Sequence, residues 1–487
     1  MLTSPASTAP AAHRFRSKVR LMPLVALIFF SVSGGAYGLE PLFSSSGPGA
    51  AMLLLFLTPL VYSVPVALFT SELSSAIPVE GGYYQWCKRA FGEFGGFQIG
   101  MLQWLTSLVD MALYPVMFAD YLSNIVPSAA DGKTDLFTIP GFGPIGSFVV
   151  DEHWVIGVVC VVVPLTLLNI RGIKSVGDSS MAFTVLAVAP FVLLAVWGIP
   201  QLFTHHVNPV APFAPAHTSA FSAMGAGLLV VMWNYNGFDS ISTVTEEIDE
   251  PRRNLPKALF LSIGLIILAY VIPSLGALAD GGWSKWQDGD FASIGGSLGG
   301  TWLMWAISIG GMFSAWGLYS SLLMSNSRIP FVMAEDGWIP KRFVRTSPKY
   351  DTPVMAIVVC SVFYAVFCND SFSNLLDFDV ILTNLTLLME LAALIALRIK
   401  EPGLPRPYRI PGGWPGIALM AVPLTAVICW AGWNVVKEGG ATLHHTLYAV
   451  AFSVVVYFPL RLYRKSRAVA PEAAAAGEAT HGSHPQG

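Results

Sequence analysis

The chain has 487 residues, of which 54% are hydrophobic and only 12% are charged, and its formal net charge is −3. Its mean hydropathy is +0.60, and a water-soluble globular domain of this length does not tolerate so apolar a composition. Basic residues are spread in small clusters between apolar segments, a pattern that indicates no nucleic acid partner. The composition therefore predicts an all-α integral membrane protein, with the lipid bilayer as its surroundings.

Long apolar runs follow one another in chain order, and each is a candidate spanning helix. They centre on residues 21–43, 50–73, 94–126, 152–169, 179–201, 218–245, 257–279, 299–327, 353–368, 375–398, 414–436 and 444–463. The distribution of Lys and Arg tests this count of twelve, because an error of one helix would move every later loop across the membrane. With both termini in the cytoplasm, all but Lys133, Lys285 and Lys437 of the 27 basic residues lie on the cytoplasmic side. The sequence thus predicts a multi-pass protein of a plasma or bacterial inner membrane with cytoplasmic termini.

The runs group into one predicted transporter domain over residues 21–465. Its first repeat covers about 21–201, its second about 218–398, and two extra helices follow at about 414–463. Residues 1–20 and 466–487 are rich in small and polar residues and are predicted to be disordered cytoplasmic segments. A cleaved signal peptide over the first run is the alternative reading of the N-terminus, but its removal would leave eleven spans and an external N-terminus.

Two of the predicted helices contain polar, glycine-bearing interruptions at corresponding places. The run 21–43 contains Ser33, Gly34, Gly35 and Gly38, and the run 218–245 contains the segment 234–240 with the sequence Asn-Tyr-Asn-Gly-Phe-Asp-Ser. Breaks in matching helices of two five-helix halves indicate a transporter with inverted repeats and a binding site at the membrane midplane. The alternative is that these glycines only allow neighbouring helices to pack closely.

Two runs also carry polar stripes with helical spacing. The run 94–126 has Gln103, Ser107, Asp110, Tyr114 and Tyr121 on one face, and the run 375–398 has Asp379, Thr383, Thr386 and Glu390. Acids at membrane depth usually face a bundle interior, so Asp110 and Glu390 are functional candidates. Their alternative is a protonated carboxyl group that only joins two helices. Glu40, beyond the first break, lines an outer vestibule or caps a helix.

Other chemistry finds no support in the sequence. The five cysteines show no metal-ligand spacing such as Cys-x-x-Cys, so neither a metal site nor a disulfide framework is expected. No phosphate-binding glycine loop is present, and nothing indicates an enzyme or a cofactor. The segment 124–151 contains no cysteine, so no disulfide-linked partner subunit is expected.

Motifs in order along the chain carry a family resemblance. The first set is Glu72-Leu73, Pro78, Gly81-Gly82-Tyr83, Trp86, Ala90-Phe91-Gly92, Gly95-Gly96-Phe97, Gly100 and Trp104. It resembles the signature of the amino acid/polyamine/organocation superfamily. The second set is Val32-Ser33-Gly34-Gly35 with Gly38 and Glu40, Asp110 to Pro115, Asp120-Tyr121-Leu122, Asn169 to Gly172, Asp239 to Thr243, Trp286, Asp288-Gly289, Glu390 and Arg406-Pro407-Tyr408. It is similar to the polyamine uptake transporters of plants and protozoa.

The resemblance implies the leucine transporter fold, with inverted repeats of five helices each and two added C-terminal helices. It also implies proton-coupled uptake of polyamines or amino acids. By position, Gly34, Gly35 and Gly38 would form one unwound segment, and Asn234, Asn236, Phe238 and Asp239 the other. The chain differs from the polyamine branch at Trp316 and Ser320, where that branch usually has acids, and at Pro41, which predicts weaker attraction for a substrate with several ammonium groups.

Three functions follow as hypotheses. The first is a proton symporter for polyamines of the putrescine and spermidine class, bound by Ser33, the glycine break, Asp110, Tyr114, Trp233 and the second break, with Asp110, Glu390 and Glu40 as candidates for proton coupling. The second is an amino acid permease, proton-coupled or exchanging, that binds the substrate carboxylate at free N–H groups of the glycine break. The third is a nutrient sensor that does not transport, against which the short, unpatterned terminal segments argue.

Overall fold

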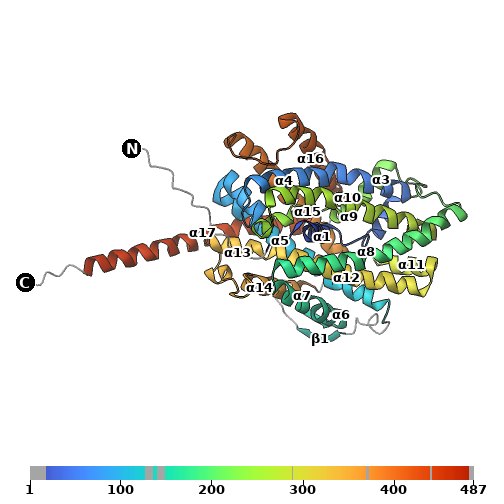
Figure 1. Cartoon of the computed structure of the whole chain (residues 1–487), viewed down its shortest axis with the longest axis horizontal. Coiled ribbons are helices and arrows are strands. Elements are labelled where there is room, and N and C mark those ends of the chain that lie inside the picture. Colours follow the sequence, from blue (N-terminus) through green and yellow to red (C-terminus); the bar gives the residue numbers. More distant parts are fainter. Residues whose placement is uncertain are drawn as a thin grey trace, which may run out of the picture.

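The computed structural model describes residues 18–126, 135–139, 148–287, 289–368, 372–438 and 441–481. This part of the chain is almost entirely helical (Figure 1). Within it, the strands are β1 (Asp135–Ile139) and β2 (Phe148–Asp151), which pair antiparallel between the third and fourth apolar helices. The helices lie mostly side by side along the long axis of the molecule, as expected of a bundle that spans a membrane.

The first predicted repeat forms five consecutive helical units, several of them interrupted. The helices are α1 (Leu21–Val32), α2 (Glu40–Ser46), α3 (Pro48–Thr58), α4 (Val64–Ala76), α5 (Gly82–Ser123), α6 (Glu152–Gly157), α7 (Val163–Ile170) and α8 (Ile173–Thr204). A π-helical turn, η1 (Pro59–Ser63), joins α3 to α4, and a second one, η4 (Val158–Val162), joins α6 to α7. Proline stands at the start of η1 and near the start of both α4 and α7, where it removes a backbone donor from the helical ladder.

The second repeat has the same order of units. It contains α9 (Ala220–Asn234), the 3₁₀ helix η5 (Ser240–Glu247), α10 (Pro251–Ala277), η6 (Leu278–Asp280), η7 (Trp283–Lys285), α11 (Phe291–Gly299), α12 (Thr301–Asn326), α13 (Arg328–Glu335), η8 (Lys341–Val344), α14 (Val354–Phe367) and α15 (Phe372–Lys400). The helices α16 (Gly413–Glu438) and α17 (Ala441–His481) follow. Both predicted breaks are confirmed: Ser33–Leu39 separates α1 from α2, and Tyr235–Asp239 separates α9 from η5.

Nine helical units of the described chain are long and apolar enough to cross a bilayer, and three shorter apolar helices are α1, α9 and α14. Two of these three end at a break, which explains why they fall short of the usual length of about 20 residues. The count of twelve spans stays a prediction.

The last helix extends far into the C-terminal segment. Helix α17 continues to His481, and the disorder expected from residue 466 stays a prediction. The run Ala473–Ala476 lies in this part, and alanine has the highest helix propensity. Residues 1–17 and 482–487, also predicted to be disordered, lie outside the described residues.

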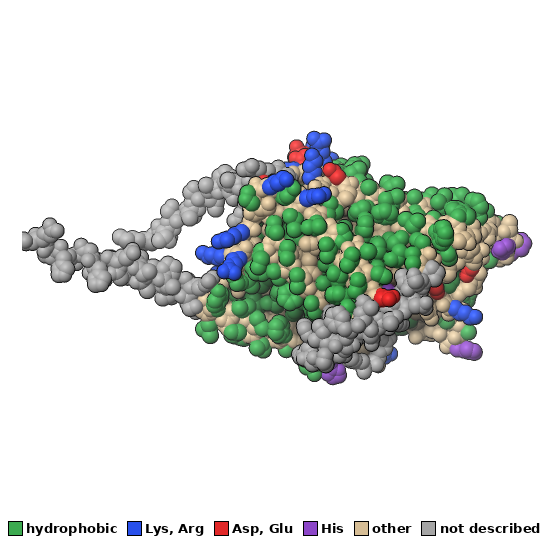
Figure 2. Space-filling view, turned by 90° about the horizontal axis from the view of Figure 1, so that it is seen from below, with side chains coloured by type: hydrophobic (Ala, Val, Ile, Leu, Met, Phe, Trp, Pro, Cys, Tyr) green, Lys and Arg blue, Asp and Glu red, His purple; other side chains and the backbone are tan. Residues whose placement is uncertain are grey.

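The helices differ strongly in burial. In their most apolar stretches, 78% of the residues of Thr301–Glu335 and 72% of those of α5 are buried, against 17% for Leu443–Arg464. The helices α12 and α5 therefore run through the centre, and α17 lies at the periphery. Large apolar side chains also cover the outside, such as Leu419 at 78% exposure, and Figure 2 shows hydrophobic side chains over the middle of the molecule. This surface suits lipid.

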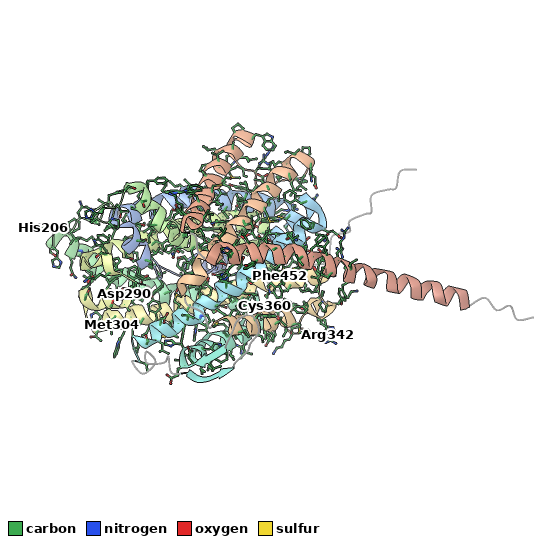
Figure 3. The ribbon with its side chains drawn as sticks, turned by 180° about the vertical axis from the view of Figure 1, so that it is seen from behind. His206, Asp290, Met304, Arg342, Cys360 and Phe452 are labelled. Carbon is green, nitrogen blue, oxygen red and sulfur yellow. The ribbon has the colours of Figure 1, made fainter. Side chains whose placement is uncertain are left out.

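The two ends of the bundle differ in charge. Figure 2 shows Lys and Arg side chains gathered near the end where α13 and α17 lie in Figure 1. In Figure 3, Arg342 lies toward that end, whereas His206 and Asp290 lie at the opposite one. We call these the basic end and the opposite end. This polarity matches the Lys and Arg asymmetry of the loops.

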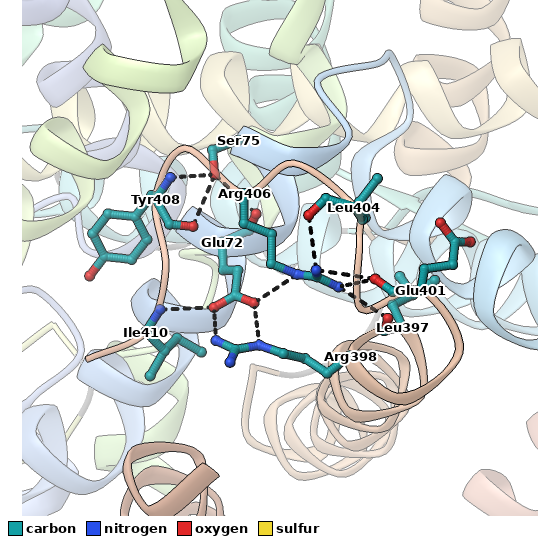
Figure 4. Close-up of polar contacts among 9 residues, drawn as sticks. All are labelled: Glu72, Ser75, Leu397, Arg398, Glu401, Leu404, Arg406, Tyr408 and Ile410. Atoms are coloured by element: carbon teal, nitrogen blue, oxygen red, sulfur yellow. Dashed lines mark hydrogen bonds and ion pairs between the residues drawn. The ribbon is translucent and has the colours of Figure 1, made fainter. Parts of the chain in front are cut away.

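Buried ion pairs join helices at the basic end. Glu72 on α4 pairs with Arg398 on α15, whose Nε donates to Glu72 Oε1 at 2.6 Å, and with Arg406, whose Nε lies 3.2 Å from the same oxygen (Figure 4). The backbone N–H of Ile410 also donates to Glu72 Oε2 at 2.8 Å. Through Arg406 and Ile410, Glu72 binds the segment between α15 and α16 to α4.

A second cluster contains two carboxyl groups and one guanidinium. Arg328, at the start of α13, donates from Nε and Nη2 to Glu247 Oε1 at 2.9 and 2.5 Å. Its Nε lies 3.4 Å from Glu80 Oε1 in the α4–α5 connection. Burial raises the pKa of Glu80, and Glu247 raises it further, against the opposite effect of Arg328. The cluster connects the α4–α5 segment, the second broken helix and α13.

Candidate functional site

The two helix breaks meet at a cavity of about 50 Å³ in the middle of the bundle. Its wall combines α1 and its break with α5, the α9–η5 break, α12 and α15. It is lined by Ser31, Val32, Ser33, Gln103, Thr106, Ser107, Asp110, Tyr114, Trp233, Asn236, Gly237, Asp239, Ser240, Leu318, Leu322, Asn326, Asp379 and Thr383. The cavity thus draws on both predicted repeats.

Glycine makes the breaks possible. Gly34, Gly35 and Gly38 have φ of +71°, +112° and +81°, and Gly237 has +102°. Side chains rarely occupy this left-handed region, so a residue with a Cβ would be strained at each position. A Cβ at Gly237 would also collide with the backbone oxygen of Ser31, where the two breaks approach one another.

Gly237→Ala is therefore expected to damage both stability and transport. We expect a lower melting temperature in detergent, from a left-handed strain of about 1–2 kcal/mol plus the collision with Ser31. Gly264→Ala is the matched control, because Gly264 lies within α10 with no atom within 4 Å of an added Cβ. Equal melting temperatures of the two variants would show that the break tolerates a side chain.

Three carboxyl groups line the cavity, of which Asp239 and Asp379 are buried and Asp110 is half-buried. Asp110 accepts a hydrogen bond from the Tyr114 hydroxyl at 2.7 Å and interacts with Trp233. Asp239 accepts a hydrogen bond at 3.4 Å from Gln103 Nε2. Asp379 interacts with Asp110 through their charges. No Lys or Arg occurs among the described residues of the lining, so the cavity is suited to a cation.

Glu390 lies next to the cavity without lining it. It is fully buried on α15 and interacts with Asp239. None of the described groups donates a hydrogen bond to either of its carboxyl oxygens. Asp239 therefore stands between the cavity and a second carboxyl group on the side of the basic end.

Six of the eleven predicted substrate-binding residues lie together in the lining: Ser33, Asp110, Tyr114, Trp233, Asn236 and Asp239. The other five lie outside it. A Cβ on Gly34 would meet Ser314 and Leu318, and one on Gly35 would meet Phe191 and Tyr37. Gly38 offers its backbone oxygen to Asn234 Nδ2 at 3.4 Å, and Phe238 is buried in the apolar core. These five residues lie in or beside the breaks but do not line the cavity.

Glu40 serves as a helix cap in the structure. Its Oε1 accepts a hydrogen bond at 3.0 Å from the backbone N–H of Phe291, the first residue of α11. A carboxylate at a helix N-terminus satisfies a backbone donor and suits the helix dipole. Of the two roles predicted for Glu40, this geometry matches capping.

The cavity contains residues that were not among the predicted site residues, above all Asp379, Gln103, Thr383 and Asn326. Asp379, Gln103 and Thr383 belong to the two polar stripes, so the helical spacing carried the signal. Asn326 stands at the end of α12 without any such pattern.

At two positions of α12, this chain lacks the acids that the polyamine branch usually has, and neither position lines this cavity. Trp316 packs against Phe118, Phe183 and Phe313, and Ser320 accepts hydrogen bonds from Asn169. Leu318 and Leu322 line the cavity instead. Acids at 316 and 320 would therefore not add charge to the cavity as it stands.

Three glycine N–H groups at the breaks already have acceptors inside the protein. Gly35 N donates to Ser33 Oγ at 3.0 Å, Gly34 N to the Phe29 oxygen at 3.4 Å, and Gly237 N to Asn236 Oδ1 at 2.8 Å. A carboxylate ligand would have to displace these internal bonds.

Comparisons with known proteins define the family. A family model described as amino acid permease matches residues 22–458. The polyamine transporter PUT1 of Oryza sativa subsp. japonica is 34% identical over 458 residues, covering 92% of this chain and 79% of that protein. The polyamine transporter RMV1 of Arabidopsis thaliana is 33% identical, covering 88% and 81%. The branched-chain amino acid permease BcaP of Bacillus subtilis is 23% identical, covering 85% and 86%.

A solved structure shows the fold. The crystal structure of MhsT in complex with L-phenylalanine superimposes with a TM-score of 0.63 at 13% identity, and covers 86% of this chain and 99% of that one. The chain belongs to the amino acid permease family. Its fold is the leucine transporter fold, with inverted repeats of five helices, and the resemblance to the amino acid/polyamine/organocation superfamily is confirmed. It is a multi-pass membrane transporter rather than an enzyme.

Proposed function

We propose that this transporter imports polyamines of the putrescine and spermidine class across the cell membrane by proton symport. The substrate lies in the cavity between the broken helices, and both termini lie in the cytoplasm. One observation carries the proposal: Asp110, Asp239 and Asp379 line a single buried cavity that has no basic residue among its described lining. The names of PUT1 and RMV1 as polyamine transporters support the same substrate class.

The chemistry of the wall suits a chain of methylenes with charged ends. Carboxylates pair with ammonium groups, while Leu318, Leu322 and the ring of Trp233 offer apolar contact to the methylenes. The C-terminal ends of α1 and α9 also point at the breaks, and a helix C-terminus favours positive charge. An inside-negative membrane potential adds about 2.3 kcal/mol per charge per 100 mV to the entry of a cation.

Proton coupling rests on the contact between Asp239 and Glu390 and on Asp110. Two buried carboxyl groups that interact with one another resist being ionised together, so this pair is suited to binding and releasing a proton. Glu390 lies on the side of the basic end, away from the cavity. While ionised Asp239 binds the substrate, Glu390 would hold the proton and release it when that end opens. Asp110 is the other candidate for proton coupling, and the geometry of Glu40 favours a helix cap.

The cavity must widen for transport. A volume of about 50 Å³ has room for a few water molecules, each of which needs about 10–15 Å³, and a polyamine is larger. The helices around the cavity therefore separate when substrate binds, as alternating access requires.

An amino acid substrate is the second candidate, because BcaP is a branched-chain amino acid permease and the cavity is small. In that case the substrate carboxylate would need N–H groups at the breaks, and those of Gly34, Gly35 and Gly237 already have internal acceptors. The three cavity carboxyl groups would repel it as well. The geometry therefore favours a cation without a carboxylate.

Uptake of labelled spermidine into proteoliposomes that contain the purified chain tests the proposal. With an inward proton gradient, we expect uptake that unlabelled putrescine inhibits and leucine does not. Protein-free liposomes and vesicles without a gradient are the controls. Leucine or arginine flux without spermidine uptake would overturn the proposal in favour of an amino acid permease, and spermidine binding without flux would favour a sensor.

A further inference from the structure

We infer that the cavity contains two separate ammonium sites along its length and therefore selects triamines over short diamines. The outer site consists of Asp110 and Asp379, and the inner site consists of Asp239 with Gln103. This inference rests on the proposed function and specifies which polyamine the site prefers.

The spacing on α5 separates the two sites. Gln103 donates a hydrogen bond to Asp239, whereas Asp110 interacts with Asp379 through their charges. Gln103 therefore lies at the level of the inner site and Asp110 at the level of the outer site. These two residues are seven positions apart in a continuous helix, which corresponds to about 10 Å along its axis.

Helix α15 gives the same order independently. Asp379 lies near the start of α15, and Glu390, which interacts with Asp239, lies eleven positions further along. Those positions correspond to about 16 Å of helix, so Asp239 and Asp379 stand at different heights. The inner site lies toward the basic end and the outer site toward the opposite end.

Both sites present a carboxyl oxygen that no described group satisfies. Asp379 is 2% exposed and Asp239 is 1% exposed, and Oδ1 of each has no hydrogen-bond partner among the described residues. Both side chains line the cavity. Burying such oxygens without a partner is costly, and an ammonium group placed at each level would supply the missing donors.

The wall also distinguishes the ends of the cavity from its flank. Leu318 and Leu322 lie on successive turns of α12 and form the apolar flank of the cavity. This flank suits a methylene chain. A diamine with four methylenes is shorter than the separation of the two sites and reaches only one at a time. A triamine such as spermidine reaches both with its terminal ammonium groups.

Competition by amines of increasing length tests this arrangement in the full-length protein. Inhibition of labelled spermidine uptake is measured for α,ω-diamines from four to ten methylenes, in the unmodified chain, in Asp379→Asn and in Asp120→Asn. Asp120 is exposed near the end of the same helix as Asp110, outside the cavity lining, so its variant controls for the change in charge.

In the unmodified chain and in Asp120→Asn, we expect affinity to rise with diamine length up to that of spermidine. In Asp379→Asn, we expect spermidine to lose affinity about tenfold or more, the scale of one charged hydrogen bond, while putrescine changes little because it can use the inner site. Asp379→Glu, which keeps the charge, should retain most of the preference, and melting temperatures identify any misfolded variant.

Two kinds of failure are distinguishable. Spermidine uptake without any dependence on diamine length, or an Asp379→Asn variant that weakens spermidine and putrescine equally, would overturn the two-site arrangement and leave polyamine transport intact. Absence of spermidine uptake in the unmodified chain would overturn the proposed function and this inference together.

Discussion

Glu72→Ala is expected to destabilise the protein by about 3–5 kcal/mol, the cost of breaking a buried ion pair from one side. The side chains of Arg398 and Arg406 are only 4% and 7% exposed, so both guanidinium groups would stay buried without their shared carboxylate (Figure 4). The N–H of Ile410 would also lose its acceptor. We expect a markedly lower melting temperature in detergent.

Glu401→Ala is the matched control for this prediction. Glu401 is paired with Arg89 by two hydrogen bonds of 2.9 and 2.6 Å, but their side chains are 32% and 43% exposed. The Arg89 hydrogen bond lowers the pKa of Glu401, although solvent screens such a pair. Its removal should cost no more than about 1 kcal/mol. Melting temperatures that fall equally in both variants would contradict a special role of Glu72.

Asp110→Asn is expected to abolish the response of uptake to a proton gradient. Asparagine has nearly the same shape and can still contact Tyr114, but it neither binds a proton nor carries charge. In proteoliposomes, spermidine uptake with an inward proton gradient should fall to the level measured without one. The loss of a charge partner for the substrate in the cavity, of the order of 2–5 kcal/mol, adds to the effect.

The exposed Asp120→Asn variant serves as control here too and should keep the gradient response. If Asp110→Asn retains the same ratio of uptake with and without a gradient as the unmodified chain, Asp110 takes no part in coupling. Coupling would then be left to the Asp239–Glu390 pair, and Glu390→Gln would be the variant to measure next.

Much of the site could be predicted because its signals are local. The glycine-bearing segments at 33–38 and 234–240 interrupt apolar runs, and both become breaks that border the cavity. The polar stripe on α5 contributes Gln103, Ser107, Asp110 and Tyr114 to the lining, as shared helical spacing implies. Glu390 was singled out as a buried acid, and it lies beside Asp239.

Other predictions depended on which way a residue faces, and here the pattern was insufficient. The glycines at 34 and 35 were expected to contact substrate, yet neither lines the cavity, and an added Cβ would meet Ser314 and Leu318 at Gly34 and Phe191 and Tyr37 at Gly35. Glu40 had two readings, and only the position of α11 distinguishes them. The absence of acids at Trp316 and Ser320 no longer argues against a polyamine substrate, because these residues lie away from the cavity.

Composition, hydrophobic runs, basic loops and glycine breaks were enough to identify a multi-pass membrane protein with two interrupted helices, and the ordered motifs were enough to identify its superfamily. These features are encoded by neighbouring residues, through burial in lipid and backbone freedom. The meeting of Asp379 with Asp110, of Asp239 with Glu390, and of Glu72 with two arginines required the tertiary structure. Such contacts depend on the rotation and relative height of packed helices, which the interactions of the whole bundle determine together.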